Sequence, residues 1–200
     1  LVLDVGELMY MPLLTAHLLA HAPGLRIACR QIERDRYAEA LASGVADMAL
    51  GALPPGQIDL VHQRLTDEPL VCLVGRGHPA AKARKLTRRD FLETPHVAIR
   101  SEVSMEQRIV RAMGNDYEQR RVMLELQHFM VMPLVLSQSP LMAIIPKVVA
   151  DTFEPELGLK TFTAPYRIEP VHVSLYWHRR SQHDAGHRWL RGEIARLFRG

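Results

Sequence analysis

The pair His128-Phe129 places an imidazole beside an aromatic ring, directly after the apolar segment RVMLELQ. An imidazole can hydrogen-bond a phenol or a carboxylate and titrates near neutral pH, and the Phe129 ring offers a face on which an aromatic ligand can stack. The alternative is ordinary core packing, with the histidine satisfied by backbone and the phenylalanine in the interior. The pair is therefore a candidate ligand contact.

The segment RSEVS, which starts at Arg100, combines a guanidinium with two hydroxyls just before a helical pattern. Arg100 can bind a carboxylate through two parallel hydrogen bonds, and Ser101 can donate another. Ser104 is explained as the N-cap of the helix, with Gln107 completing a capping box. Glu102 argues against a turn that binds only anions. Arg100, Ser101 and Glu102 are candidate ligand contacts.

A similar turn follows the first apolar segment, LVLDV. A helical pattern begins there, so free backbone N–H groups and the positive end of the helix dipole are available to an anion. The alternative is that Glu7 complements this dipole as an ordinary acid of the first turn, which is worth about 0.3–1 kcal/mol. The candidates at this turn are Gly6, Glu7, Leu8 and Met9.

Catalytic and metal-binding patterns are weak. His183 and His187 have the i, i+4 spacing of a metal-binding pair, but the sequence offers no third ligand beside them. The Met-rich piece HFMVMPLVL is better explained as deformable core lining than as a metal site. No nucleophile elbow, carboxylate pair or Gly-rich phosphate loop stands out. We therefore expect no enzymatic activity, no bound metal and no cofactor.

Short apolar segments alternate with helical patterns along the chain, which favours α/β architecture with parallel sheets covered on both faces. The predicted strands are 1–5, 25–33, 47–53, the start of 70–86, 94–99, 121–127, 141–146, 159–165 and 171–178. The predicted helices are 7–24, 36–44, 104–114, one from residue 128, 146–153, and a last one with Trp189, Leu190, Ile194, Leu197 and Phe198 on one face.

The α/β pattern restarts after the Gly/His-Pro turn and polar stretch within 70–86. The last helix has no third domain to build, so it is expected to return to the first. Two similar lobes with a central cleft follow, with ligands at the carboxyl ends of strands. Pro54 and Ile145 lie at such strand ends and complete the set of candidate ligand contacts.

The composition and the start of the chain argue against a membrane-spanning protein, a nucleic-acid-binding surface and an exported protein. The 200 residues are 48% hydrophobic, and no apolar run approaches the roughly 18 residues that span a bilayer. The net charge is +3, but the basic runs KARKLTRR and HRRSQH hold no aromatic residue to stack on bases. Cys29 and Cys72 lie in apolar segments, which favours buried thiols in a reducing compartment. No export signal opens the chain, and the missing initiator Met suggests a piece of a longer protein.

Several motifs resemble the effector-binding domain of LysR-type transcriptional regulators: LVLDVGELMYMPLL, ALASGVADMALGALP, RLTDEPLVCLVGRGHP and MPLVLSQSPLMAIIP, in that order. D-V-G-E…MP and LQHF are most similar to regulators of nodulation and aromatic degradation, which answer flavonoids, salicylate or related aromatic acids. The resemblance implies the type 2 periplasmic-binding-protein fold, with residues 1–73 and 166–200 in one Rossmann-like subdomain and 74–165 in the other. Family members that carry Ser or Thr beside the first turn differ from this chain, which leaves open how a carboxylate is held.

The resemblance also implies partners. A small aromatic or organic acid is expected to bridge the two lobes, and a winged helix-turn-helix absent from this chain to bind DNA. The domain is expected to form a homodimer through helix 7–21 and strand 25–33, and a homotetramer in the full-length cytoplasmic protein. An exported solute receptor of the same fold is the alternative, and an enzyme built on this fold is the third possibility.

Overall fold

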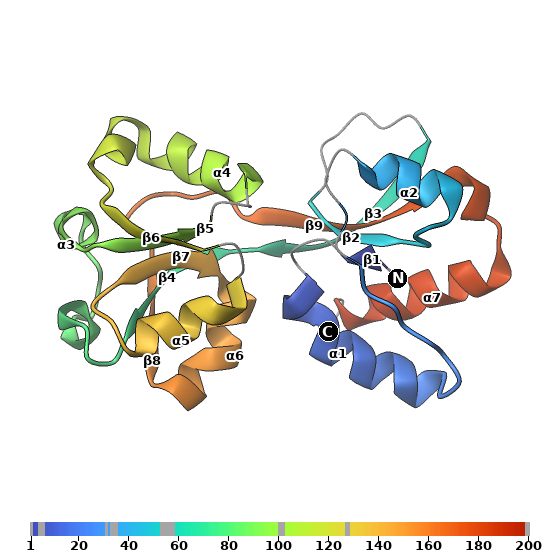
Figure 1. Cartoon of the computed structure of the whole chain (residues 1–200), viewed down its shortest axis with the longest axis horizontal. Helices are drawn as coiled ribbons and strands as arrows, with labels where there is room; N and C mark the ends of the chain where they lie inside the picture. The colour runs from blue at the N-terminus through green and yellow to red at the C-terminus, as the bar shows by residue number, and fades with distance from the viewer. Residues whose placement is uncertain are drawn as a thin grey trace. The chain divides into compact units, whose positions relative to one another are not determined.

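The structure is a computed structural model that describes residues 2–3, 7–30, 32, 36–52, 59–99, 103–126 and 129–198. The chain divides into two compact units (Figure 1). Unit 1 comprises Leu1–Asp67 and His172–Gly200, and unit 2 comprises Glu68–Val171. The predicted subdomain boundaries stay a prediction. No helix among the described residues has the length and apolarity needed to cross a membrane.

Unit 1 contains a four-stranded mixed sheet in the order β1-β2-β9-β3. Its strands are β1 (Val2–Leu3), β2 (Ala49–Gly51), β3 (Leu60–Glu68) and β9 (Val171–His178). Its helices are α1 (Glu7–His21), α2 (Tyr37–Ser43), the 3-10 helix η5 (Arg179–Ser181) and α7 (Ala185–Leu197). β1 and β2 run parallel, whereas β9 runs antiparallel to β2. The prediction of an all-parallel sheet was therefore wrong, because β9 returns to this sheet in the opposite direction.

Helices α1 and α7 pack together in unit 1, as Figure 1 shows. Leu14 and Leu18 of α1 are fully buried, one turn apart on the same face. Asp184 caps α7 by accepting a hydrogen bond from the His187 backbone N–H at 2.7 Å. Helix α2 ends where Gly44 adopts the left-handed region at φ 84°, which favours glycine.

Unit 2 contains a five-stranded mixed sheet in the order β6-β5-β7-β4-β8. Its strands are β4 (Leu70–Gly75), β5 (His96–Ile99), β6 (Val122–Leu126), β7 (Met142–Pro146) and β8 (Leu159–Thr163). β5 is parallel to both β6 and β7, and β4 is antiparallel to β7 and β8. Every residue of β4 and β7 is buried, as expected for the continuous apolar runs at the centre of a covered sheet.

The helices of unit 2 cover both faces of this sheet. They are α3 (Arg88–Glu93), α4 (Val103–Met113), α5 (Met132–Ser137) and α6 (Lys147–Leu157), with 3-10 helices η2 (Pro79–Lys82), η3 (Gly114–Gln119) and η4 (Phe129–Val131). Figure 1 shows α4 on one side of the sheet and α5 with α6 on the other. The connections from β5 to β6 and from β6 to β7 proceed in opposite directions across the sheet, which places right-handed crossovers on opposite faces.

The segment 25–33 was predicted as a strand, but its described residues 25–30 and 32 contain none. Arg26, Ala28, Cys29 and Arg30 are exposed, and no strand of the described chain pairs with them. Apolar alternation makes a strand only where a neighbour supplies hydrogen bonds and packing. The prediction that Cys29 is buried was therefore wrong, whereas Cys72 in β4 is buried as predicted.

One strand and one α-helix of the described residues were missed. β3 is largely half-buried and carries polar residues along most of its length, so its apolar signal is weak. Helix α3 buries only Phe91 and was hidden in a basic run, although Thr87 and Asp90 form a capping box at its start.

The predicted inner face of the last helix was partly wrong. Trp189 is 40% exposed, and Arg191 faces the interior instead. Arg191 lies over the Trp177 ring, 4.4 Å from its centroid, and donates hydrogen bonds to the Ser181 and Gln182 carbonyls. A guanidinium that is paired in this way can occupy a core position that the apolar pattern alone would not assign to it.

Candidate functional site

The carboxyl ends of three parallel strands lie at one edge of the unit 2 sheet. These ends are Ile99 of β5, Leu126 of β6 and Pro146 of β7, and α4, η4 with α5, and α6 begin beyond them. The first N–H groups of a helix have no partner within the helix and carry the positive end of its dipole. This edge, the carboxyl edge of unit 2, therefore gathers groups that suit an anionic ligand.

Two predicted contacts lie at this edge within the described residues. Phe129 opens η4 and its side chain is 5% exposed, and Ile145 in β7 is fully buried. Both side chains belong to the interior of unit 2, which favours core packing for Phe129 and leaves its contact with a ligand a prediction. A buried ring can still form the floor of a site whose polar contacts come from backbone groups.

Of the other predicted contacts, the structure describes only the three that belong to helix α1. Helix α1 begins at Glu7, so Glu7, Leu8 and Met9 form its first turn in unit 1, as predicted. Gly6, Pro54, Arg100, Ser101, Glu102 and His128 lie outside the described residues. Their roles stay predictions.

Glu68 is a buried acidic residue at this edge that the sequence did not reveal. Its side chain is buried, and its Oε1 accepts a hydrogen bond from the Val148 backbone N–H at 2.8 Å. The Lys147 backbone N–H donates to the Pro69 carbonyl, also at 2.8 Å. The residue at the N-cap of α6, Pro146, provides no side-chain cap. The start of α6 therefore holds a carboxylate of this chain already.

Helix α4 is held by the buried Arg120 and the half-buried Tyr117 on the body of unit 2. Arg120, whose side chain is 2% exposed, donates to the Glu106 carboxylate at 2.8 Å, and the Tyr117 hydroxyl donates to the same oxygen at 2.7 Å. Burial, and then the hydrogen bond to Glu106, raises the pKa of Tyr117. Met105, Ile109 and Met113 bury one face of the helix. α4 begins at Val103, one residue ahead of the predicted N-cap Ser104.

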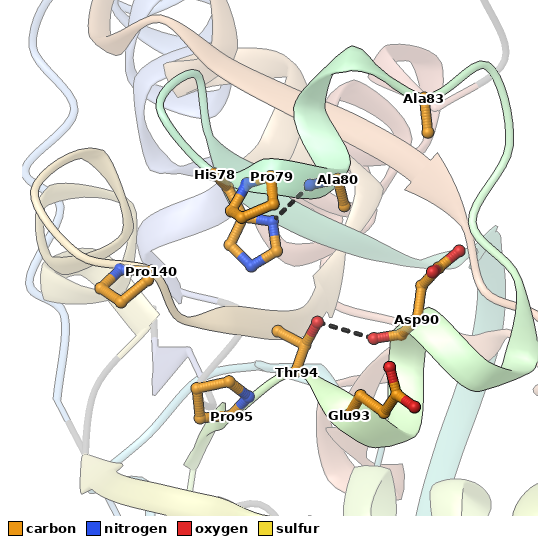
Figure 2. Close-up of a pocket in the computed structure, with 9 residues that line it drawn as sticks. All are labelled: His78, Pro79, Ala80, Ala83, Asp90, Glu93, Thr94, Pro95 and Pro140. Atoms are coloured by element: carbon orange, nitrogen blue, oxygen red, sulfur yellow. Dashed lines mark hydrogen bonds between the residues drawn. The ribbon is translucent and has the colours of Figure 1, made fainter.

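A pocket of about 410 Å³ lies at the opposite edge of the same sheet (Figure 2). Its walls include Thr94 and Pro95 ahead of β5, Pro140 ahead of β7, and His78 beyond β4. Thus it lies at the amino ends of the parallel strands, away from the carboxyl edge of unit 2.

The polar groups of this pocket are largely engaged. His78 Nδ1 accepts from the Ala80 backbone N–H at 3.0 Å, and the Thr94 hydroxyl donates to the Asp90 carbonyl at 2.6 Å (Figure 2). Burial lowers the pKa of His78 and so favours a neutral ring. The carboxylates of Asp90 and Glu93 also line the wall. This chemistry disfavours an organic anion in the pocket.

The His183/His187 pair does not act as a metal clamp in this structure. His187 Nδ1 lies 2.6 Å from Arg191 Nη1, which can only donate, so Nε2 carries the ring proton and donates to the Asp47 carbonyl at 3.0 Å. With both ring nitrogens engaged, His187 fastens α7 to the segment ahead of β2.

The LysR substrate binding domain model matches residues 2–199 of the chain. The transcriptional activator NagR of a Ralstonia species is 29% identical over 98% of this chain, and NahR of Pseudomonas putida is 28% identical over 98%. The chain spans 64% and 65% of the lengths of these two relatives. SyrM of Rhizobium meliloti is 32% identical over 78% of this chain and 48% of its own length.

Solved structures agree on the fold. A transcriptional regulator from Vibrio parahaemolyticus superposes with a TM-score of 0.89 at 21% identity, covering 98% of this chain and 92% of its own. The regulatory domain of MexT from Pseudomonas aeruginosa gives 0.81 at 20% identity and covers 98% of both chains. The Synechocystis CcmR regulatory domain, solved in complex with 2-PG, gives 0.79 at 14% identity over 98% of this chain and 95% of its own.

The predicted fold class is confirmed by these structures, and the predicted family by the match over nearly the whole chain. The family is one of transcriptional regulators rather than enzymes, in agreement with the prediction that the domain is not an enzyme. The chain belongs to the LysR substrate-binding domain family and is the effector-binding regulatory domain of a LysR-type transcriptional regulator.

Proposed function

We propose that this domain senses a small organic acid, with aromatic carboxylic acids as the first class, at the carboxyl edge of unit 2. In the full-length cytoplasmic regulator the bound acid controls DNA binding by a region beyond these 200 residues. Support comes from the similarity to the activators NagR and NahR and from a neighbour of the same fold solved with 2-PG. The assignment of the effector to one position at this edge rests on which helix start already holds a carboxylate of the chain.

The observation that carries the proposal is the hydrogen bond between Glu68 and Val148, 2.8 Å long. It fills the start of α6 with a carboxylate of the chain itself. Of the two eleven-residue helices that begin at this edge, α6 is thereby closed to an incoming acid. The start of α4, which follows Arg100, Ser101 and Glu102 in sequence, is the position we assign to the carboxylate of the effector.

The effector ring is assigned to His128 and Phe129. Phe129 opens η4 beyond β6, and β6 is the parallel neighbour of β5, the strand that leads into α4. A carboxylate at α4 therefore places the body of a small acid along the β5 and β6 ends. His128 then hydrogen-bonds a ring hydroxyl, and the apolar floor is supplied by buried side chains such as Ile145.

Effector control requires a differential affinity for two states of the domain. A shift of the population from 1:99 to 99:1 needs about a 10⁴-fold preference of the effector for one state. We propose that bridging of the two subdomains supplies this preference, with Gly6, Glu7, Leu8, Met9 and Pro54 as the contacts from the first subdomain.

We further propose a homodimer of this domain and a homotetramer of the whole regulator. Leu13 and Leu19 expose their apolar side chains on α1. Val122 and Met123 do so on β6, which is an edge strand of its sheet. Exposed apolar side chains on a helix and on the outermost strand of a sheet are suited to contact with another protein chain.

The test is thermal unfolding of residues 1–200 with benzoate, salicylate and aliphatic carboxylates, each titrated to saturation. A ligand at 100 times its Kd adds about 2.7 kcal/mol to the free energy of unfolding. Arg100→Ala and His128→Ala should lose the shift in melting temperature for the acid that binds. Arg89→Ala is the matched control, because Arg89 pairs on the surface with Glu93 in α3. The proposed site is wrong if Arg100→Ala responds as the parent does.

A further inference from the structure

Two imidazoles of α1 and one carboxylate of α7 come together in unit 1. His17 and His21 are one helical turn apart, and a ligand atom of each lies within 4.8 Å of the other and of a Glu193 oxygen. His17 Nε2 is 2.9 Å from Glu193 Oε2, and the two imidazole rings stack with centroids 4.2 Å apart. Nothing in the proposed effector chemistry uses these groups.

The ring of His21 is already in the tautomer that a metal ion needs. Its Nδ1 lies 2.9 Å from the His17 carbonyl oxygen. A carbonyl can only accept, so Nδ1 carries the proton and Nε2 keeps its lone pair. Histidines that bind metals usually donate their second ring N–H to a carbonyl or carboxylate in this way, which fixes the ring.

Glu193 supplies a buried negative charge. Its side chain is 3% exposed, and a carboxylate in such a position needs a cationic partner. Arg196 bonds Oε1, which leaves Oε2 to His17. The two hydrogen-bond partners of the carboxylate are therefore an arginine and a histidine, so its surroundings favour positive charge.

We propose that His17, His21 and Glu193 form a binding site for a divalent transition-metal ion, with Zn²⁺ as the first candidate. Two imidazoles and one carboxylate are a set that holds Zn²⁺ and leaves a fourth position for water. Imidazole ligands also favour Zn²⁺ and its neighbours over Mg²⁺ and Ca²⁺. The ion takes the place of the proton between His17 Nε2 and Glu193 Oε2, and that proton passes through solvent to His17 Nδ1, so that the ring binds the ion as a neutral imidazole.

The geometry requires only small side-chain adjustments. Ligand distances of about 2.0–2.2 Å place tetrahedral donor atoms roughly 3.4 Å apart, closer than the 4.8 Å span that now encloses the three groups. His21 is exposed and His17 is half-buried, so rotation of the two imidazoles can close the site while Glu193 stays in place. The bound ion would then cross-link α1 to α7.

The test is a Zn²⁺ titration of the tag-free, chelator-treated domain by calorimetry, with thermal unfolding in parallel. We expect one ion per chain and a higher melting temperature. His21→Ala should weaken Zn²⁺ binding about 100-fold or more, since loss of an outer partner of a ligand alone costs about 10–100-fold. His183→Ala, which removes another exposed histidine, should bind as the parent does.

Glu193→Gln tests the contribution of the buried carboxylate separately from that of the two imidazoles. The substitution keeps the shape of the side chain and removes its charge. It should also weaken Zn²⁺ binding, and circular dichroism at the start of the titration reports whether the variant is folded. Absence of Zn²⁺ binding by the parent domain, or equal affinities for the parent and His21→Ala, would overturn the proposal.

Discussion

The carboxylate of Glu68 closes the start of helix α6 by accepting the Val148 N–H at 2.8 Å, across 80 positions of sequence. Helix starts are usually capped by a residue next to them, and Pro146 leaves this one without a side-chain cap. An acidic residue that is distant in sequence thus takes the place of the usual N-cap side chain. It also fills the start of one of the two eleven-residue helices at this edge with a carboxylate of the chain itself.

Removal of this cap should cost stability. We expect Glu68→Ala to lower the free energy of unfolding by about 1–2 kcal/mol, because a half-buried N–H at the start of the helix loses its acceptor. Urea denaturation followed by far-UV circular dichroism measures the change. Glu156→Gln is the control, since Glu156 is exposed near the other end of α6. Equal stabilities of the Glu68→Ala and Glu156→Gln variants would show that the cap contributes nothing.

His96 should make the domain sensitive to mild acid. Burial is the main cause that lowers its pKa from 6.5 to about 4. Between these values the unfolded chain binds a proton that the folded chain does not, so stability falls as pH falls through 6.5 towards 4. This group alone should remove about 2 kcal/mol between pH 7 and pH 5.

Urea denaturation at several pH values tests this dependence. His96→Leu removes the titrating group, so its stability should change much less between pH 7 and pH 5, even if it starts lower. His183→Ala removes an exposed histidine and should keep the slope of the parent. A His96→Leu slope equal to that of the parent would assign the pH dependence to other groups.

The two cysteines should differ sharply in reactivity. Cys29 is exposed, whereas Cys72 is buried in β4 and its pKa is raised to about 12 by burial. Since the thiolate is the reactive form, Cys72 should be inert while the domain is folded. Titration with a chromogenic disulfide reagent should find one reactive thiol in the folded domain and two in denaturant. Cys29→Ser should abolish the reaction of the folded domain, and a persistent signal would contradict the burial of Cys72.

The Asp116 carboxylate links α3 to the segment that follows β8. Tyr166 donates its hydroxyl to Asp116 at 2.7 Å, and Arg88 pairs with the same carboxylate. Tyr166→Phe should lower the free energy of unfolding by about 1 kcal/mol, measured by urea denaturation. Tyr176→Phe, in which a ring stacked on His62 also loses its hydroxyl, is the control. A smaller loss for Tyr166→Phe than for Tyr176→Phe would refute the link.

The sequence predicted elements best where pattern and packing coincide. β9 has the predicted bounds, 171–178, because its apolar residues alternate with polar ones along a strand that has neighbours on both sides. The apolar runs of β4 and β7 are likewise central and buried. Residues 25–30 have a similar composition but no partner strand among the described residues, and composition alone cannot supply one.

The candidate site could be predicted only in part. The order of strands and helices indicates that ligand groups lie where strands end, and the structure places β5, β6 and β7 with their ends at one edge. That the start of α6 already holds a carboxylate depends on Glu68, a contact that no local pattern encodes. The inward position of Arg191 was hidden for the same reason, since Trp177 and two carbonyls from other segments satisfy it.

Strand β9 lies between β2 and β3 in the sheet of unit 1, and it comes more than 100 residues after them. During synthesis, β2 and β3 therefore emerge from the ribosome long before the strand that joins them, whereas unit 2 is one continuous segment and can fold as soon as residue 171 is available. Unit 1 must wait for β9 and α7. The nascent chain should accordingly acquire a protease-resistant unit 2 first, with the unpaired edges of β2 and β3 as the part of the chain that needs protection by a chaperone.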